Sequence, residues 1–356
     1  MKALAEFIEI SKYAGERFDL IQAGGGNSSV KLENGEMIIK ASGYLLSDME
    51  ENRGYSTVVT EKVSKIVQNK TVTSETNKRK RESLTAVLIQ EATLENSDRP
   101  SIETLLHSFL HKYTLHTHPI VANMILMQKD WESTLLNIFG DETIALVPYA
   151  TPGIDLALKL HGVLQRFEKI PEIIFLQNHG LIITSPNKNE VIRLNEMVLE
   201  KLELFLEVDF SRYKLSNKLS SYVNTVQNDS VIAYLSEDLH LNNYLTKHKK
   251  LFFQTPFCPD GFVFCGFNAI EVQDLQDDKP LQNYLTKYFE LPKIILFEKS
   301  LFIIAENVKK AKEIEDVLKF QIMVFDKNIS NDFNLLGLDE LSYLGNWEAE
   351  KYRQKL

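Results

Sequence analysis

The sequence predicts a two-domain protein built from both helices and strands. Its 356 residues, of which 44% are hydrophobic, exceed the length at which a single core usually stops growing. Helical and strand-like hydrophobic patterns alternate as far as Val208, and a polar stretch follows from Asp209 to Asp229. We therefore expect a first domain over residues 1–229 and a small α+β second domain over residues 230–356.

Each expected element of the first domain follows from a local pattern. Apolar residues at helical spacing predict helices, short apolar runs predict strands, and segments rich in Gly or Asn predict turns. The expected elements are, in order, a helix over 1–20, a hairpin with strands over 28–32 and 36–42, a polar helical region over 55–96, a helix over 101–112, an extended segment over 113–119, a helix over 120–128, a strand over 143–150, a helix over 154–167, a strand-turn-strand unit over 172–185 and a helix over 189–208.

The second domain has an order of its own. Its patterns predict strand-like segments over 250–257 and 261–267, a hairpin over 293–305 and a helix over 307–325. Apolar residues recur along one face of that helix, which can cover the hairpin. No internal repeat is evident in the sequence.

Composition narrows the class of protein. A formal net charge of −9 argues against nucleic acid or an anionic membrane as the partner, because either favours a basic face. Only Cys258 and Cys265 are present, so neither a disulfide framework nor a thiolate zinc site is supported. The first 20 residues do not resemble a signal peptide, and no apolar run approaches the roughly 18 residues that span a membrane. We expect a cytoplasmic protein that acts on a small molecule.

Two histidines in the stretch "YTLHTHP" indicate a metal site. Side chains at positions i and i+2 of a strand point to the same side, so His116 and His118 can face one object. In isolation the pair could equally be two structural histidines. His179 changes the balance, because "QNHGLI" places it in a turn between strands, where Gly180 lets the backbone bend tightly. Zinc in catalytic sites typically has three protein ligands, which these three histidines could supply.

Glu103 and the segment "AGGGNSS" each allow two interpretations. Glu103 lies near the start of an expected helix, where a carboxylate either stabilises the helix end or acts as a general base beside the metal. The glycines up to Gly26 could form a nest of backbone N–H groups for a phosphate or simply a tight turn. The segment lacks the lysine of a P-loop and the glycine spacing of a dinucleotide-binding fingerprint.

Taken in order, "GGGNSSVKL", "KASG", "RPSIETLLH", "LHTHP" and "QNHGLI" resemble the class II aldolase/adducin family, which includes L-fuculose-phosphate and rhamnulose-phosphate aldolases. The resemblance implies a three-layer α/β/α domain with a largely antiparallel central sheet. It also implies zinc (Zn2+) held by His116, His118 and His179, with Glu103 as the catalytic acid/base. The family positions that hold the substrate phosphate correspond to Asn27, Ser42, Gly43 and Ser101.

One position departs from the family pattern. Simple fuculose-type aldolases have two serines before the glutamate, whereas this chain has Ser101 followed by Ile102, which cannot donate a side-chain hydrogen bond. Lys40, next to "ASG", could supply a positive charge instead. We therefore expect the phosphate to be held by Lys40 and Gly26 together with the four family positions.

The later segments "KHKKLFFQTPFCPDGFVFCG" and "NWEAEKYRQKL" resemble the end of the aldolase half of bifunctional rhamnulose-1-phosphate aldolase/dehydrogenase proteins. Those relatives continue into a short-chain dehydrogenase domain, whereas this chain stops, and no dinucleotide fingerprint follows. We expect no nicotinamide cofactor and no catalytic role for the second domain.

The resemblance implies an aldolase that cleaves or forms a sugar phosphate or related ketose through an enediolate. A sugar-acid dehydratase or decarboxylase of the same superfamily shares the metal and the glutamate, whereas a 4-epimerase has aspartate at the position of Glu103. An adducin-like binding protein without chemistry is a further alternative. Family resemblance also suggests a homotetramer with active sites near the subunit interfaces.

Overall fold

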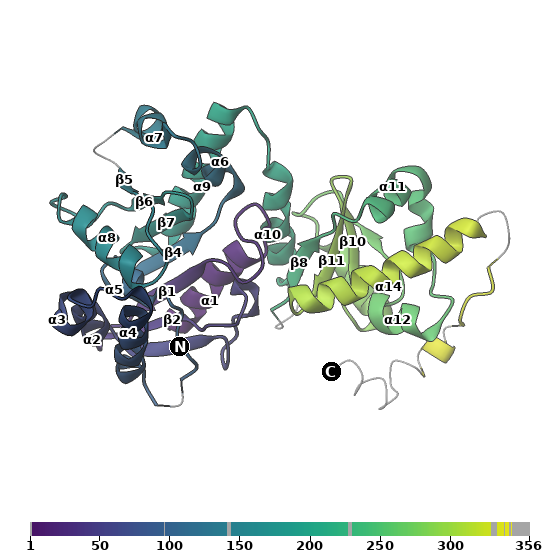
Figure 1. Ribbon diagram of the computed structural model, residues 1–356. Helices are drawn as coiled ribbons and strands as arrows, with labels where there is room; N and C mark the ends of the chain where they lie inside the picture. The colour runs from purple at the N-terminus through teal and green to yellow at the C-terminus, as the bar shows by residue number, and fades with distance from the viewer. Residues whose placement is uncertain are drawn as a thin grey trace. The chain divides into compact units, whose positions relative to one another are not determined.

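The computed structural model describes residues 2–95, 97–140, 144–226, 230–328, 333–337, 339–341 and 343. The chain divides into two compact units, Met1–Phe210 and Ser211–Leu356, which we call the first and the second unit (Figure 1). Asp229, the expected domain end, and the segment "NWEAEKYRQKL" lie outside the described residues. No helix in the described part of the chain has both the length and the apolar character needed to cross a membrane.

The first unit contains seven strands, nine α-helices and two 3-10 turns among its described residues. The strands are β1 (Asn27–Lys31), β2 (Glu36–Lys40), β3 (Tyr55–Val59), β4 (Tyr113–Thr117), β5 (Ile144–Val147), β6 (Ile173–Leu176) and β7 (Gly180–Ser185). The helices are α1 (Lys2–Gly15), α2 (Thr60–Ser64), α3 (Lys70–Thr73), α4 (Lys78–Ala92), α5 (Thr104–Ser108), α6 (Ile120–Leu126), α7 (Trp131–Phe139), α8 (Ile154–Leu164) and α9 (Lys188–Leu206), with 3-10 turns η1 (Leu46–Asp48) and η2 (Lys65–Gln68).

These strands form one sheet in the order β3-β2-β1-β4-β7-β6-β5. Every pairing is antiparallel except that of β5 with β6, so the expectation of a largely antiparallel sheet is confirmed. The expected polar helical region over 55–96 is wrong at its start, where β3 pairs with β2. The sequence "YSTVV" alternates buried and partly exposed side chains there, as an edge strand with one covered face requires.

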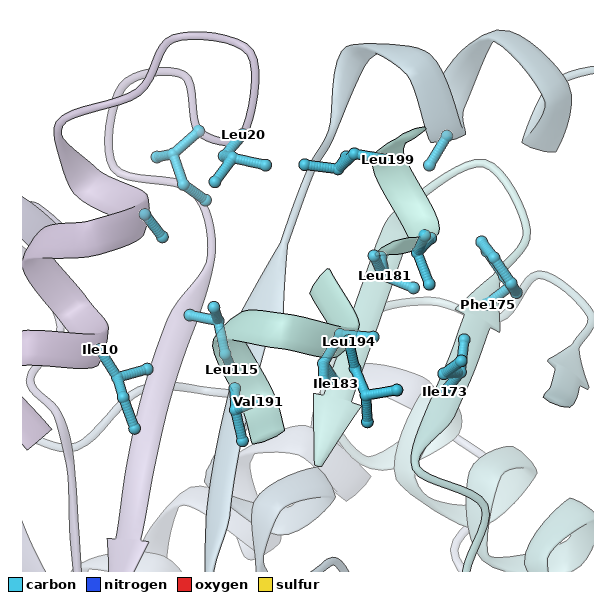
Figure 2. Packing of buried hydrophobic residues seen from close by; sticks show 14 of the residues in the cluster. Ile10, Leu20, Leu115, Ile173, Phe175, Leu181, Ile183, Val191, Leu194 and Leu199 are labelled. Carbon is cyan, nitrogen blue, oxygen red and sulfur yellow. The ribbon is translucent and has the colours of Figure 1, made fainter. Parts of the chain in front are cut away.

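Helices cover both faces of the sheet. Side chains alternate along each strand, so Ile173 and Phe175 face one layer while Ile174 and Leu176 face the other. Figure 2 shows the first of these layers, where Ile10 of α1 and Val191 of α9 pack over Leu115 at the centre of the sheet. The second layer holds α2, α4, α5 and α8. The expected three-layer α/β/α architecture is therefore confirmed.

The second unit has its own sheet, in the order β8-β11-β10-β9. Its elements are α10 (Ser211–Val223), β8 (Ile232–Leu235), α11 (Leu239–His248), η3 (Lys249–Phe253), α12 (Pro259–Cys265), β9 (Ile270–Glu271), α13 (Lys279–Tyr288), β10 (Ile294–Phe297), β11 (Ser300–Ala305) and α14 (Val308–Lys327). The expected hairpin and the helix that follows it are confirmed as β10, β11 and α14. Helix α14 lies against β11 of that hairpin (Figure 1). Its apolar side chains, such as Ile314 and Leu318, belong to the same buried cluster as those of the hairpin.

The two strand-like segments expected over 250–257 and 261–267 are wrong, because they form η3 and α12. Their aromatic residues suggested strands, but Pro259 favours the first turn of a helix and Cys258 accepts a hydrogen bond from the backbone N–H of Gly261 at 3.4 Å. The aromatic residues are used instead to build the core of this unit, in which Phe252 is buried.

The second unit repeats the topology of half of the first, a repeat that the sequence does not reveal. The order β4-α6-α7-β5-α8-β6-β7-α9 corresponds to β8-α11-α12-β9-α13-β10-β11-α14. The four strands are neighbours in the same order, with the same single parallel pair, β5 with β6 and β9 with β10. From Gly180 and Ser300 onward the two segments align without a gap, and Asn187 and Asn307 each cap the following helix. Few aligned residues are identical, which hides the repeat.

This correspondence explains where the chain divides. In the first unit, β1 pairs with the outer side of β4, whereas within the described part of the chain β8 has no strand on that side and contacts α10 instead. The backbone N–H of Ala233 donates to Oγ of Ser220 at 2.8 Å, so α10 satisfies part of the open edge. Helix α10 therefore belongs with the second unit. The polar sequence of this region suggested a division near Ser230, whereas the two compact units divide before Ser211.

Candidate metal centre

The structure brings His116, His118 and His179 together at one end of the central strands. His116 lies on β4, His118 follows that strand, and His179 lies in the turn between β6 and β7. The Nε2 atom of His116 is 3.2 Å from that of His118 and 3.3 Å from that of His179. Among the described residues this is the one group of three or more His, Cys, Asp or Glu side chains close enough to hold a metal ion.

Tight backbone contacts hold the three imidazoles in place. A Cβ atom added to Gly180 would clash with the carbonyl oxygen of Thr117, so only glycine lets the turn that carries His179 approach β4. The backbone N–H of His118 donates to the carbonyl of Leu20 at 2.9 Å. A Cβ atom on Gly25 would lie 2.7 Å from Nδ1 of His118. The glycine-rich segment therefore packs directly against the histidine cluster.

Burial holds the imidazoles of His116 and His118 in their neutral form. Burial, together with the neighbouring His118 and His179, lowers the pKa of His116 well below its usual value. Burial likewise lowers the pKa of His118 to about 4, with His179 contributing. Nδ1 of His116 donates to the carbonyl oxygen of Leu181 at 3.0 Å, which leaves the lone pair of its neutral ring on Nε2. The lone pair of His116 therefore points toward the other two rings.

This donor set fits a divalent cation such as zinc. Two nitrogen ligands at about 2.0–2.1 Å from a tetrahedral zinc ion are about 3.3 Å apart, which matches the two Nε2 separations. The hydrogen bond from His116 to Leu181 is the kind of outer contact that usually orients a metal-binding histidine. Among the described residues, the buried Nδ1 atom of His179 has no hydrogen-bond partner.

Glu103 faces the histidines and does not cap its helix. It occupies the N-cap position of α5, but its side chain accepts no hydrogen bond from that helix. Its Oε1 lies 3.2 Å from Nε2 of His179 and its Oε2 lies 3.5 Å from Nε2 of His116. Of the two interpretations of Glu103, the geometry therefore matches a carboxylate directed at the metal centre.

Asn27 lies next to His116 on the adjacent strand β1 and donates to Oε2 of Glu103 at 2.6 Å. Its other amide atom, Oδ1, is hydrogen-bonded to Nε2 of His107. Both ends of the Asn27 side chain are thus engaged by protein groups, and only the second hydrogen of its NH2 group is available to a substrate. The sequence analysis did not single out His107. The spacing was a usable signal, because residues four positions apart in a helix are neighbours and His107 follows Glu103 by four positions.

The other expected phosphate-binding residues lie on two adjacent segments. Ala41 bridges to Pro100, and the backbone N–H groups of Ser42 and Ser101 donate to the carbonyls of Arg99 and Lys40. Gly43 has a φ of +93°, and a Cβ atom there would meet no atom within 4 Å, so its backbone borders open space. Gly26, with a φ of +65°, instead packs against the backbone of β4.

Lys40 is a buried cation near the carboxylate. Its side chain is only 4% exposed, and among the described residues it has no ion-pair partner within 4.0 Å. Burial lowers the pKa of its ammonium group, whereas Glu103 and Asp48 partly offset that effect. An anion near Lys40 would therefore stabilise its charged form.

The first unit matches a known protein family. The family model described as Class II Aldolase and Adducin N-terminal domain matches residues 5–206. A Bacillus subtilis (strain 168) protein named Uncharacterized oxidoreductase YuxG is 23% identical over 224 residues, which cover 60% of this chain and 31% of that protein. The chain thus spans about a third of the length of the curated relative that it matches.

Two solved structures resemble part of the chain. The N-terminal class II aldolase domain of a conserved protein from Thermoplasma acidophilum is 22% identical, covers 57% of this chain and 93% of that one, and has a TM-score of 0.49. L-fuculose-1-phosphate aldolase from Thermus thermophilus is 17% identical, covers 58% of this chain and 96% of that one, and has a TM-score of 0.38.

Proposed function

We propose that this chain, which belongs to the class II aldolase and adducin family, is a zinc-dependent aldolase that cleaves or forms a sugar phosphate or related ketose. The observation that carries the proposal is the carboxylate of Glu103, held 3.2 and 3.5 Å from the Nε2 atoms of His179 and His116. A zinc ion held by His116, His118 and His179 would polarise the substrate carbonyl and stabilise the negative charge that develops on its oxygen.

Glu103 is the group that moves the proton. In the synthetic direction it takes a proton from the carbon next to the carbonyl of the donor ketone, and the aldehyde oxygen gains a proton from water as the carbon–carbon bond forms. In the cleavage direction the hydroxyl group loses its proton to water as the aldehyde leaves, and Glu103 then protonates the donor carbon. The hydrogen bond from Asn27 holds one carboxylate oxygen, and the other oxygen is left on the side of His179. A fixed carboxylate at this position loses little freedom when the substrate binds.

The substrate phosphate is held where Lys40, Ser42, Gly43 and Ser101 meet. Hydroxyl groups and the open backbone at Gly43 supply hydrogen bonds, and Lys40 supplies a charge within a chain that is acidic overall. Ile102 is 55% exposed and offers no hydrogen bond, so the charge of Lys40 compensates for the missing hydroxyl. Gly26 and Asn27 lie on the side of this region that faces the metal. Gly26 contributes its backbone, and Asn27 contributes the second hydrogen of its NH2 group.

Among its described residues, the second unit does not repeat the three histidines of the first. In the topological repeat, the positions of His116, His118 and His179 are occupied by Leu235, Glu237 and Lys299. A leucine cannot bind a metal ion, and a lysine ammonium has no lone pair to offer. We assign this unit a supporting role. We propose that the protein is a cytoplasmic homotetramer in which the first unit of each subunit contains an active site.

The proposed function can be tested by incubating the zinc-loaded chain with dihydroxyacetone phosphate and a panel of short aldehydes. A new sugar phosphate that mass spectrometry detects, and that a chelator abolishes, is the expected result. Release of water or carbon dioxide from sugar acids, without aldol product, would replace the aldolase by a dehydratase or decarboxylase. A chain that neither binds zinc nor is stabilised by it would instead be an adducin-like binding protein.

A further inference from the structure

A buried chain of hydrogen bonds lies behind Glu103. Asn27 and Ser29 are two residues apart on β1, so their side chains point to the same side of the sheet. The imidazole of His107, fully buried on α5, lies between them: its Nδ1 is 2.7 Å from Oγ of Ser29 and its Nε2 is hydrogen-bonded to Oδ1 of Asn27. Asn27 in turn donates to Glu103.

The chemistry of these groups sets the direction in which the hydrogen bonds behind Glu103 are donated. A neutral imidazole has one donor and one acceptor nitrogen, and burial lowers the pKa of His107 to about 3, with Lys31 contributing. When the hydroxyl of Ser29 donates to Nδ1, the proton of the ring is on Nε2 and is donated to Oδ1 of Asn27. The NH2 group of Asn27 then faces Glu103. The reversed amide would place Oδ1 against the carboxylate, which leaves two buried acceptors without a proton between them.

We propose that His107 is a positioning residue, which acts through Asn27 to hold the carboxylate of Glu103 beside the three histidines. The inference rests on the proposed role of Glu103 as the acid/base. Within the described residues, His107 lies one hydrogen bond farther from the metal centre than Asn27 and forms its side-chain hydrogen bonds with Ser29 and Asn27. Its effect on turnover therefore passes through the orientation of the amide.

Two substitutions at position 107 separate this role from simple packing. In His107→Gln the side-chain NH2 reaches roughly where Nε2 lies and can still donate to Asn27. In His107→Asn the shorter amide stays near Ser29 and cannot. The matched control is His111→Asn, because the ring of His111 is hydrogen-bonded to the backbone carbonyl of Ile170 and takes no part in the chain behind Glu103.

The first readout needs no activity. Solvent exchange of the Asn27 side-chain NH2, followed by NMR on metal-free protein, should become about fivefold faster in His107→Asn, as the loss of one hydrogen bond implies. It should stay close to the native rate in His107→Gln and His111→Asn. Unchanged exchange in His107→Asn would overturn the proposal.

The second readout is turnover of the zinc-loaded chain. His107→Asn should lower kcat by about 10- to 100-fold with little change in KM, as is usual for groups that orient a catalytic ligand or base, and His107→Gln should restore most of that loss. Equal losses of kcat in both variants would contradict positioning through Asn27. If the native chain turns over no aldol substrate, the proposed function fails, while the exchange of the Asn27 amide still decides the positioning role.

A third measurement uses the native chain, in case the variants do not fold. The 15N chemical shifts of histidine show which ring nitrogen carries the proton, and His107 can be assigned through its contacts with Asn27 and Ser29. The proton is expected on Nε2. A proton on Nδ1 would point the lone pair of Nε2 at Asn27 and would overturn the proposal.

Discussion

Oε1 of Glu103 lies 3.2 Å from Nε2 of His179, although Glu103 begins α5 and His179 lies in the turn between β6 and β7. Both side chains meet at β4, which holds the central position between β1 and β7 in the sheet. The carboxylate and the imidazoles are therefore positioned by the sheet, and each can be altered without removing the other.

Removal of one histidine should release the metal. Elemental analysis of the native chain should find about one zinc per chain, and His118→Ala should lower that content sharply because two ligands rarely retain zinc. His240→Ala, at an exposed position on α11, is the matched control and should keep the native content. Full zinc content in His118→Ala would sink the assignment of the site.

Glu103→Gln should separate binding from chemistry. The amide oxygen of the new side chain can still accept the hydrogen bond from Asn27, so the site should keep its zinc. Turnover should fall by roughly 10²–10⁴-fold, which is the usual contribution of a general acid–base group. Glu91→Gln, an exposed substitution on α4, serves as the control. An unimpaired rate in Glu103→Gln would assign the base to another residue.

Gly180→Ala should destabilise the turn that carries His179. The added methyl group meets the backbone of Thr117, and forced overpacking of this kind costs about 1–3 kcal/mol. Zinc should bind more weakly, because His179 moves with the turn. Gly162→Ala provides the contrast: its methyl group meets nothing within 4 Å on α8, and the change should stabilise the chain by about 0.5–1 kcal/mol. Urea unfolding measures both effects, and equal changes would refute the close approach at Gly180.

Acid should weaken the metal-free chain through its buried histidines. Burial lowers the pKa of His107 to about 3, whereas a histidine in the unfolded chain titrates near 6.5. Between these values the unfolded chain binds a proton that the folded chain does not, so stability falls as the pH drops from about 6.5 toward 3. One histidine contributes at most about 1.4 kcal/mol per pH unit.

The matched variant for this pH effect is His107→Gln, which does not titrate. Urea unfolding of metal-free protein between pH 7.5 and 5 should show a shallower loss of stability in that variant. The same slope as in the native chain would mean that His107 is protonated in the folded state.

The second unit should fold alone only when α10 is included. In a fragment over 211–356, α10 covers the open edge of β8, whereas a fragment over 230–356 leaves the backbone of Ala233 exposed to pairing with other chains. Size-exclusion chromatography should show a monodisperse 211–356 fragment and aggregation of the shorter one. A stable, monodisperse 230–356 fragment would show that α10 is dispensable.

The first unit should keep the metal by itself. All three histidines and Glu103 lie before Phe210, so a fragment over 1–210 should retain its zinc if it stays soluble. A soluble, zinc-loaded fragment that has its native oligomeric state but no activity would show that the second unit completes the active site.

Local patterns identified much of this architecture because those patterns depend on neighbours in the sequence. The helical spacing from Asn189 to Val208 and the apolar runs on both sides of Gly180 led directly to α9 and to the β6–β7 hairpin. The aromatic segments near Phe252 and Phe262 misled, because aromatic residues fill a core equally well from strands, 3-10 turns and helices. The strand β3 was missed because its pairing partner, β2, supplies most of the reason for its conformation.

By itself, the sequence determined which residues could form the candidate site: the alternation of a strand gives His116 and His118 one direction, and the turn before Gly180 presents His179. Tertiary structure alone decided three further points. It turned Glu103 away from its own helix toward the histidines, it placed His107 and Asn27 behind that carboxylate, and it assigned α10 to the second unit. The physical reason is the same in each case. A hydrogen bond between a strand and a helix, or the covering of a sheet edge, depends on which distant segments come into contact in the folded chain. The spacing of residues along the sequence does not predict those contacts.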